Sequence, residues 1–345
     1  MKSWMFKKIN TAATVTLLIS LLAGCSPESK KSSSYTGSVN PRIFGGVEAD
    51  QKFQSENGVV GLFVIMKDKS NQFGVAICSG TLIDKKIILT ATHCIAGDGN
   101  SQVVAVGVSF KPDFQNVLEN WGQMSEADFE KAGLIFVDNV AANPNYMKNI
   151  KSESDYLNPN ITWDDIALLR LSKDAPTEFK IAKLPTKEDI QLLKTNSELF
   201  LAGFGMNSAI ANKAVVNPKT GERDVVPVGE KNPSSGVLRK ANKKVVTHIT
   251  ADNKEFSIES SKSGSCHGDS GGPAFLTKAD GTTIQVGVAD RTRTLIPEDN
   301  IGNCNELMTY TGVIGHMDWI MPAMQQLLTA KVETAPAHHA TTAKP

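Results

Sequence analysis

The sequence has no net charge, because 36 lysines and arginines balance 36 aspartates and glutamates. A protein that binds nucleic acid usually carries a basic excess on one face, so we expect no nucleic-acid partner. None of the five cysteines stands in a C-x-x-C or histidine-rich spacing, so the sequence predicts no zinc site. No other motif predicts a metal ion or a cofactor. No internal repeat is visible in the 345 residues, a length that allows two domains or one large one.

The chain also lacks a comfortable membrane span: the apolar run TAATVTLLISLLAG near the N-terminus is too short. It follows Lys2, Lys7 and Lys8, a pattern that predicts a targeting segment. The run ends in Leu-Ala-Gly-Cys25, which resembles a bacterial lipobox. That resemblance implies a signal peptide at 1–24, a lipid anchor on Cys25 and a place in the cell envelope. The alternative is an ordinary secretory signal with an unrelated cysteine.

Polar segments flank the body of the chain. Residues 25–42 are rich in serine, lysine and proline and predict a flexible tether. Residues 331–345 are low in complexity and predict a disordered tail. In that tail we interpret His338 and His339 as polar residues rather than metal ligands.

Between residues 43 and 315, short β-type runs alternate with turn residues. Runs such as VAICSGTLI, KIILTAT and PAFLT are separated by glycine, asparagine, aspartate and proline. This punctuation predicts an all-β fold, an antiparallel sandwich or barrel. The segment 316–330 differs, because its apolar residues recur at helical spacing, and it predicts a C-terminal amphipathic helix. Pro322 is expected to start the regular part of that helix.

The cysteines predict disulfides. If Cys25 carries a lipid, an even number remains in an exported chain, which indicates two disulfide bonds. Their connectivity stays open at this point, because four cysteines allow three pairings. The four are Cys78, Cys94, Cys266 and Cys304.

Three separate motifs together predict nucleophilic catalysis. A hydroxyl nucleophile needs a base and a third group that orients the base. The stretch GDSGGP places Ser270 among glycines, LTATHC places His93 at the end of a β run, and WDDIALL places Asp165 before an apolar strand. Asp164 is the rival for the orienting role. Each motif alone is weak evidence.

In the order His93, Asp165, Ser270 these motifs resemble the trypsin/chymotrypsin family of serine proteases. The segments RIFGGVEA, SGTLIDKKIILTATHC, LAGFG and YTGVIGHMDWI match the family's order as well. The resemblance covers about residues 43–330. It implies two six-stranded antiparallel β-barrels, at about 43–184 and 185–315, followed by the helix at 316–330. It also implies the disulfides Cys78–Cys94 and Cys266–Cys304.

The resemblance also implies a role for each motif residue. Ser270 would attack the scissile carbonyl of a protein or peptide substrate, His93 would accept its proton, and Asp165 would orient the imidazole. Backbone N–H groups of Gly268 and Ser270 would form the oxyanion hole.

The same resemblance implies a zymogen. Cleavage between Arg42 and Ile43 would free an α-ammonium group that pairs with the buried Asp269. Because no cysteine links residues 25–42 to the body, we expect this cleavage also to release the body from a lipid anchor.

The sequence departs from trypsin at the specificity pocket. Gly264 stands where trypsin-like members carry an aspartate, and Thr292 and Met308 replace wall glycines. A short, uncharged pocket of this kind favours small or medium apolar residues before the cut. The protein would then not cleave after its own Arg42, so a separate activating protease is required.

Two further departures leave alternatives open. Asp290 stands where the family usually has a serine beside the catalytic aspartate, and two buried carboxylates need compensation. Arg291 or Arg293 supplies it, or the loop is displaced. The segment 206–236 is interpreted as an exposed inserted loop near the cleft. The alternatives to a protease are a catalytically impaired pseudoprotease that binds partners at the cell envelope, and a structural envelope lipoprotein.

Overall fold

A computed structural model describes residues 43, 46–97, 101–151, 158, 161–207, 212–216, 223–227, 235–259, 263–293, 304 and 307–331. All of them belong to the second of two units into which the chain divides, Pro41–Pro345. The predicted signal peptide, Cys25 and Arg42 lie outside the described residues, and so does the tail beyond residue 331.

The first barrel contains the strands β2 to β7. Its closed order is β2 (Val59–Asp68), β3 (Phe73–Asp84), β4 (Ile87–Thr90), β7 (Ala167–Leu171), β6 (Leu134–Ala142) and β5 (Ser101–Ser109). Every pairing is antiparallel. The apolar runs predicted as strands form its interior, where Leu62, Ile88 and Leu168 are fully buried.

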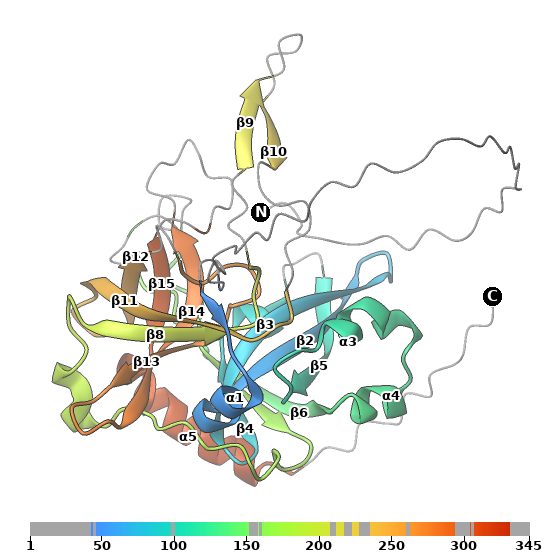
Figure 1. Cartoon of the computed structure of the whole chain (residues 1–345), viewed down its shortest axis with the longest axis horizontal. Helices are drawn as coiled ribbons and strands as arrows, with labels where there is room; N and C mark the ends of the chain where they lie inside the picture. Colours follow the sequence, from blue (N-terminus) through green and yellow to red (C-terminus); the bar gives the residue numbers. More distant parts are fainter. Residues whose placement is uncertain are drawn as a thin grey trace, which may run out of the picture. The chain divides into compact units, whose positions relative to one another are not determined.

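The second barrel closes in the same way, through strands of the C-terminal half. Its members are β8 (Glu198–Gly203), β11 (Arg239–Ile249), β12 (Glu255–Glu259), β13 (Pro273–Thr277), β14 (Thr283–Arg293) and β15 (Leu307–Gly312). Strand β8 pairs with both β13 and β11, which closes the ring, and the short β1 (Val47–Glu48) adds to β11. The predicted pair of six-stranded antiparallel barrels is therefore confirmed (Figure 1).

Inside the segment predicted as a loop, two short strands pair. They are β9 (Asn212–Val216) and β10 (Arg223–Pro227), which form an antiparallel two-stranded sheet. The inserted segment 206–236 therefore contains a β-hairpin, which was not predicted from the sequence. Each strand contains a pair of adjacent valines, residues of high β-propensity, within a segment otherwise rich in proline, glycine and asparagine.

Short helices lie in the connections between strands, and one longer helix follows the last strand. The short ones are α1 (Gln51–Asn57), α2 (His93–Ala96), α3 (Gln115–Asn120), α4 (Glu126–Lys131) and the 3₁₀ turns η1 (Trp121–Gln123), η3 (Lys187–Gln191) and η5 (Ile314–His316). The predicted C-terminal helix is α5 (Met317–Thr329), which carries Pro322 in its interior rather than at its start. Among the described residues, no helix has the length and apolarity to span a membrane.

Helix α5 packs on the first barrel, although it follows the second in sequence. Ile320, Ala323 and Leu327 are buried in the same core as the β2 and β7 side chains. The buried Arg170 of β7 donates from Nη1 to the carbonyl oxygens of Leu327, at 2.6 Å, and Ala330, at 2.7 Å. Those carbonyls end a helix and lack intrahelical donors, so the guanidinium caps it.

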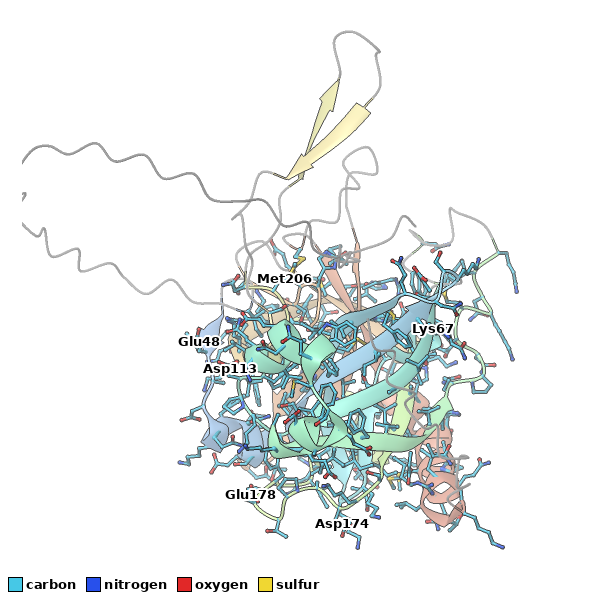
Figure 2. The ribbon with its side chains drawn as sticks, turned by 90° about the vertical axis from the view of Figure 1, so that its right-hand side faces the viewer. Glu48, Lys67, Asp113, Asp174, Glu178 and Met206 are labelled. Atoms are coloured by element: carbon cyan, nitrogen blue, oxygen red, sulfur yellow. A yellow bond between two sulfur atoms is a disulfide. The ribbon has the colours of Figure 1, made fainter. Side chains whose placement is uncertain are left out.

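Charged side chains lie mainly at the outside of the fold. Glu48, Asp174 and Glu178 are exposed examples, and all three lie toward the edges of the view in Figure 2. The charged residues buried between the barrels' strands are therefore exceptions, and each has an identifiable partner or site.

Candidate active site

His93 and Asp165 meet at the ends of two neighbouring strands. Helix α2 begins at His93, shortly after the end of β4 at Thr90, and Asp165 lies just before β7, the strand that pairs with β4. The Asp165 carboxylate accepts from the ring Nδ1 of His93 at 2.5 Å and from its backbone N–H at 2.9 Å. The two hydrogen bonds fix the ring's orientation, and the tautomer with hydrogen on Nδ1 leaves Nε2 as a base.

Charge stabilisation within this pair shifts both pKa values. Burial by itself lowers the pKa of His93, but the negative charge of Asp165 and its hydrogen bond outweigh burial and raise that pKa above its ordinary value. Burial raises the pKa of Asp165, but the His93 charge and hydrogen bonds hold it below its ordinary value. Asp165 is therefore an anion that favours a protonated imidazole.

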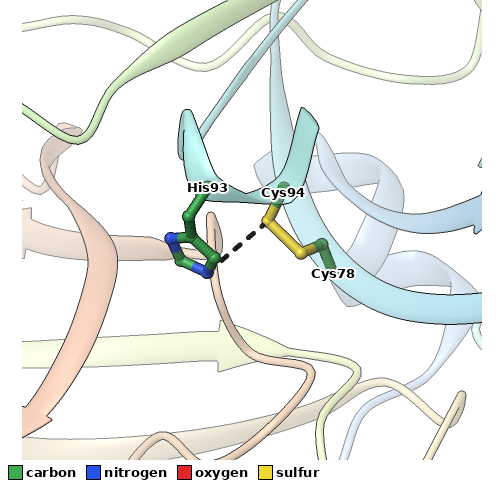
Figure 3. Close-up of side chains that lie close together, drawn as sticks. All are labelled: Cys78, His93 and Cys94. Carbon is green, nitrogen blue, oxygen red and sulfur yellow. Dashed lines mark hydrogen bonds between the residues drawn. A yellow bond between two sulfur atoms is a disulfide. The ribbon is translucent and has the colours of Figure 1, made fainter. Parts of the chain in front are cut away.

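The Cys94 sulfur lies near both His93 and the backbone of Ser270. Cys78 on β3 is bonded to Cys94 on α2, and the Cys94 sulfur lies 3.9 Å from His93 Nε2 (Figure 3). The carbonyl oxygen of Ser270 lies 3.6 Å from the same sulfur and accepts from the Ser79 N–H at 2.7 Å. His93, Asp165 and the Ser270 backbone are thus brought to one place.

Positive backbone φ angles shape the loop around Ser270. Gly268 has φ of 98° and Gly271 has φ of 81°, a region that favours glycine. A Cβ on Gly271 would lie 2.0 Å from Thr90 Oγ1, so the loop fits against the first barrel only without a side chain there. Ser79 Oγ donates to the Gly268 carbonyl at 2.9 Å, which anchors the loop from the other barrel.

Asp269 is buried between the glycines. Its carboxylate accepts from the N–H groups of Gly205 and Cys266, both at 2.8 Å. Burial raises its pKa from 3.8 to about 6, because the two hydrogen bonds and the nearby Arg239 compensate only in part. Ile43 is itself buried in the core of the second barrel.

The predicted specificity residues lie on adjacent segments of the second barrel. Thr292 on β14 and Met308 on β15 are register partners, and Gly264 is buried. The Ser265 hydroxyl hydrogen-bonds to the hydroxyl of Tyr310, also on β15. The second predicted disulfide, Cys266–Cys304, is present.

Sequence reasoning missed Lys244 near this region. Its buried ammonium donates to Ser263 Oγ at 2.9 Å and to the Ser263 carbonyl, directly before Gly264. Burial lowers the pKa of Lys244. The lysine comes from β11, 19 residues before Ser263 in the chain, so no local motif indicates this contact.

Asp290 lies beside Asp165. The segment that carries Asp290 is paired with β15 on both sides of this residue, so it is not displaced from the barrel. Arg291 contacts Asp290 and also binds Glu255, with Nη2 2.9 Å from Glu255 Oε2. Its guanidinium lies 4.2 Å from the centre of the Trp163 ring. Of the alternatives left open by the sequence, Arg291 is the cation that contacts Asp290. The side chain of Arg293 lies outside the described residues.

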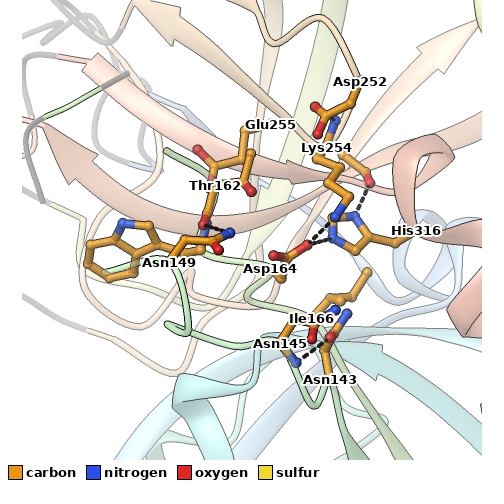
Figure 4. A network of polar contacts seen from close by, with 12 residues as sticks. Asn143, Asn145, Asn149, Thr162, Asp164, Ile166, Asp252, Lys254, Glu255 and His316 are labelled. Atoms are coloured by element: carbon orange, nitrogen blue, oxygen red, sulfur yellow. Dashed lines mark hydrogen bonds and ion pairs between the residues drawn. The ribbon is translucent and has the colours of Figure 1, made fainter. Parts of the chain in front are cut away.

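Asp164 belongs to a separate network behind the pair. Its carboxylate accepts from His316 Nε2 at 2.8 Å and from Lys254 Nζ at 2.9 Å (Figure 4). Burial raises the pKa of Asp164, but these hydrogen bonds lower it overall. The rival orienter therefore binds His316 instead of His93, with a backbone φ of 51° that turns the two neighbouring carboxylates to different partners.

Three groups of side chains among the described residues have the geometry to surround a metal ion. Two of them consist of a histidine and two disulfide-bonded cysteines, whose sulfurs are not thiolates. The third is His93, Asp165 and Asp290, where the ring already bonds to Asp165.

The protein has two closed barrels, with a histidine–aspartate pair and a glycine-rich serine loop where they meet. These features define the chymotrypsin-like class of serine-protease folds. The sequence matches the Trypsin family over residues 59–320, and the chain belongs to that family.

Similar proteins agree with this assignment. Serine protease Hayan of Drosophila melanogaster is 28% identical over 223 residues, which are 63% of this chain and 31% of that protein. CLIP domain-containing serine protease B9 of Anopheles gambiae is 26% identical over 310 residues, 87% of this chain and 67% of that protein. The chain thus spans only about a third to two thirds of these relatives. A solved HL collagenase structure shares the fold, with a TM-score of 0.50 and 20% identity, over 83% of this chain and 98% of its own.

Proposed function

We propose that this chain is a serine endopeptidase that cleaves proteins or peptides through an acyl-enzyme intermediate. The observation that carries the proposal is the buried Asp165 carboxylate bonded to His93 at 2.5 Å, with the Ser270 carbonyl oxygen 3.6 Å from the sulfur of the adjacent Cys94. A buried anion with this geometry stabilises the imidazolium that forms when the ring takes a proton.

The reaction uses each group in turn. Ser270 Oγ attacks the scissile carbonyl carbon while Nε2 of His93 takes the hydroxyl proton. The N–H groups of Gly268 and Ser270 stabilise the resulting oxyanion. The imidazolium then protonates the leaving amine, and water, activated by the same imidazole, hydrolyses the ester.

This proposal predicts that the protein nicked after Arg42 cleaves a peptide library and reacts with a fluorophosphonate at one serine. Ser270→Ala is expected to abolish the labelling and to lower kcat/KM by about 10⁶-fold. Provided that the nicked protein is folded, the two assays distinguish an active enzyme from a pseudoprotease or a structural protein. A nicked wild type that neither cleaves nor reacts would instead support a pseudoprotease that binds partners, or a structural envelope protein.

The same library tests the substrate preference. We propose small or medium apolar residues before the cut, because Gly264 offers no carboxylate and Thr292 and Met308 stand side by side. The ammonium of Lys244, bonded to the residue before Gly264, also disfavours a lysine or arginine side chain nearby. A cleavage profile dominated by arginine or lysine would contradict this preference.

We propose further that the chain is a lipid-anchored zymogen, exported and activated at Arg42–Ile43 by another protease. The lipobox-like Leu-Ala-Gly-Cys25 motif supports the anchor, and the animal relatives named above lend it no support. Cleavage then releases the body, since neither disulfide reaches residues 25–42.

Detergent phase partitioning tests this release. Full-length Ser270→Ala protein purified from a bacterial membrane is expected in the detergent phase, and nicking with trypsin is expected to move the body to the aqueous phase. Cys25→Ala protein, expected in the aqueous phase before nicking, is the control. A nicked body that stays with detergent contradicts the proposal.

A further inference from the structure

Asp290 is the extra residue of a β-bulge. Strand β14 pairs with β15 in one register up to Ala289 and in another from Arg291 onward, so the register shifts at Asp290. Bulges next to active sites commonly re-aim one side chain. Here the side chain of Asp290 is 0% exposed, and carboxyl oxygens of Asp290 and Asp165 and a ring nitrogen of His93 lie within 4.8 Å of one another.

Arg291 does not supply a full counter-charge to Asp290, because it is already bound to Glu255. That carboxylate receives Nη1 at 3.1 Å and Nη2 at 2.9 Å from Arg291, and the backbone N–H of Trp163 at 2.6 Å. A bidentate pair with a third donor is a strong site for an ionised carboxylate. The charges of Glu255 and Arg291 therefore balance each other, and Asp290 contacts only Nη1 of the guanidinium.

The two oxygens of Asp290 have different surroundings. Oδ2 accepts from Arg291, while Oδ1 is buried and receives no hydrogen bond from any described residue. The Asp165 carboxylate, which can only accept, has an oxygen within 4.8 Å of a carboxyl oxygen of Asp290. On β15, the register partners around the bulge are Thr309 and Tyr310, and neither adds a charge. A buried carboxyl group that has an unpartnered oxygen and lies next to an anion is satisfied when it carries a proton.

We infer that Asp290 is an uncharged carboxylic acid that donates its proton in a hydrogen bond to Asp165, and so acts as a positioning residue for the catalytic pair. This inference rests on the proposed protease function. Burial raises the pKa of Asp290 well above its ordinary value, and the adjacent Asp165 charge raises it further against the opposing effect of Arg291. The acid replaces the serine hydroxyl that related proteases are expected to place here.

The charge of the buried cluster supports this state. With Asp290 protonated, Asp165 and Glu255 carry two negative charges and Arg291 one positive charge, so the net charge is −1 while His93 is neutral. When His93 becomes an imidazolium, the net charge is zero. An ionised Asp290 would leave an excess negative charge at both stages, which is costly away from water.

The test compares variants at position 290 in the nicked protein. Asp290→Asn keeps a donor toward Asp165 and an acceptor toward Arg291, so kcat is expected within about threefold of wild type, with an unchanged acid limb of kcat/KM against pH. Asp290→Ser restores a hydroxyl donor and is expected within about tenfold. Asp290→Ala removes the donor and is expected to lower kcat by about tenfold with little change in KM.

Infrared difference spectroscopy reads the proton directly. At pH 7, wild type minus Asp290→Asn is expected to show the carbonyl band of a protonated carboxylic acid. Asp189→Asn is the control, because Asp189 is also largely buried but bonds to Lys278 at 2.7 Å, and it should remove no such band.

Two results would overturn the inference. One is the absence of an acid band from Asp290. The other is a pKa for the acid limb of kcat/KM that is lower by one unit or more in Asp290→Asn, as removal of a nearby negative charge predicts. A wild type that fails to react with a fluorophosphonate would refute the protease function instead. The infrared band would still report the proton on Asp290 in that case, so the two failures are distinguishable.

Discussion

Replacement of Asp165 by asparagine should lower kcat/KM of the activated protein about 10⁴-fold at neutral pH, as the same change does in the serine-protease triad. The carboxylate accepts from both the Nδ1–H and the backbone N–H of His93. An amide has only one oxygen, so an NH₂ group must face one of these donors. The favourable response is the other imidazole tautomer, in which Nε2 carries the hydrogen and cannot accept a proton from Ser270. The measurement is kcat/KM against pH with a peptide substrate.

Asp164→Asn is the matched control for this change. The two aspartates are neighbours and equally buried, and asparagine tolerates the positive φ at residue 164. Because Asp164 binds His316 and Lys254, its loss should mainly lower the melting temperature and leave most of the activity. If Asp164→Asn loses as much activity as Asp165→Asn, the assignment of Asp165 as the orienting residue is wrong.

The second large effect is expected at Asp269. In the nicked protein, the α-ammonium of Ile43 is expected to pair with this carboxylate, which is buried within the loop that carries Gly268 and Ser270. Asp269→Asn would leave a buried ammonium without its counter-charge, at a cost of about 3–5 kcal/mol. That corresponds to a loss of roughly 10²- to 5 × 10³-fold in kcat/KM. Titration with a fluorophosphonate should show the same loss as slower labelling of Ser270.

The uncut chain offers an independent check on Asp269. Burial raises its pKa from 3.8 to about 6, so the folded state holds a proton that the unfolded state releases earlier. This group therefore contributes stability below about pH 4 and loses that contribution as the pH rises to about 6, an effect of at most about 3 kcal/mol. Urea unfolding of uncut Ser270→Ala protein, with and without Asp269→Asn, isolates the effect. Identical pH dependence in the two proteins would contradict it.

Strands with continuous apolar runs could be predicted from the sequence. Val59–Asp68 and Ile87–Thr90 are strongly apolar and form β2 and β4 in the first barrel. Strand β11 could not be predicted in this way, since its sequence RKANKKVVTHI is dominated by polar residues. Two of its cations, Arg239 and Lys244, point inward and are buried because the fold supplies distant partners such as Gly205 and Ser263.

The candidate site was predicted to a different extent for each residue. His93, Asp165 and Ser270 stand in short motifs, so the sequence alone indicated them. The network at Asp290 could be predicted only in part, because Arg291 is adjacent in sequence while Glu255 comes from β12, which β15 separates from β14. Only the closed barrel brings these strands together. The proton inferred on Asp290 follows from that three-dimensional arrangement and from no motif.

Because α5 packs on the first barrel, that barrel cannot be completed until the end of the chain has been synthesised. Ile320, Ala323 and Leu327 complete the apolar interior of a barrel whose own strands end at residue 171. While the ribosome is still making the second half, the first barrel lacks α5. The apolar surface that α5 covers is therefore exposed to water, and Arg170 lacks the carbonyl oxygens that it binds in the folded protein. Nascent chains shorter than about 330 residues should consequently depend on chaperones, and a premature stop codon near the end should be as damaging as one in the middle.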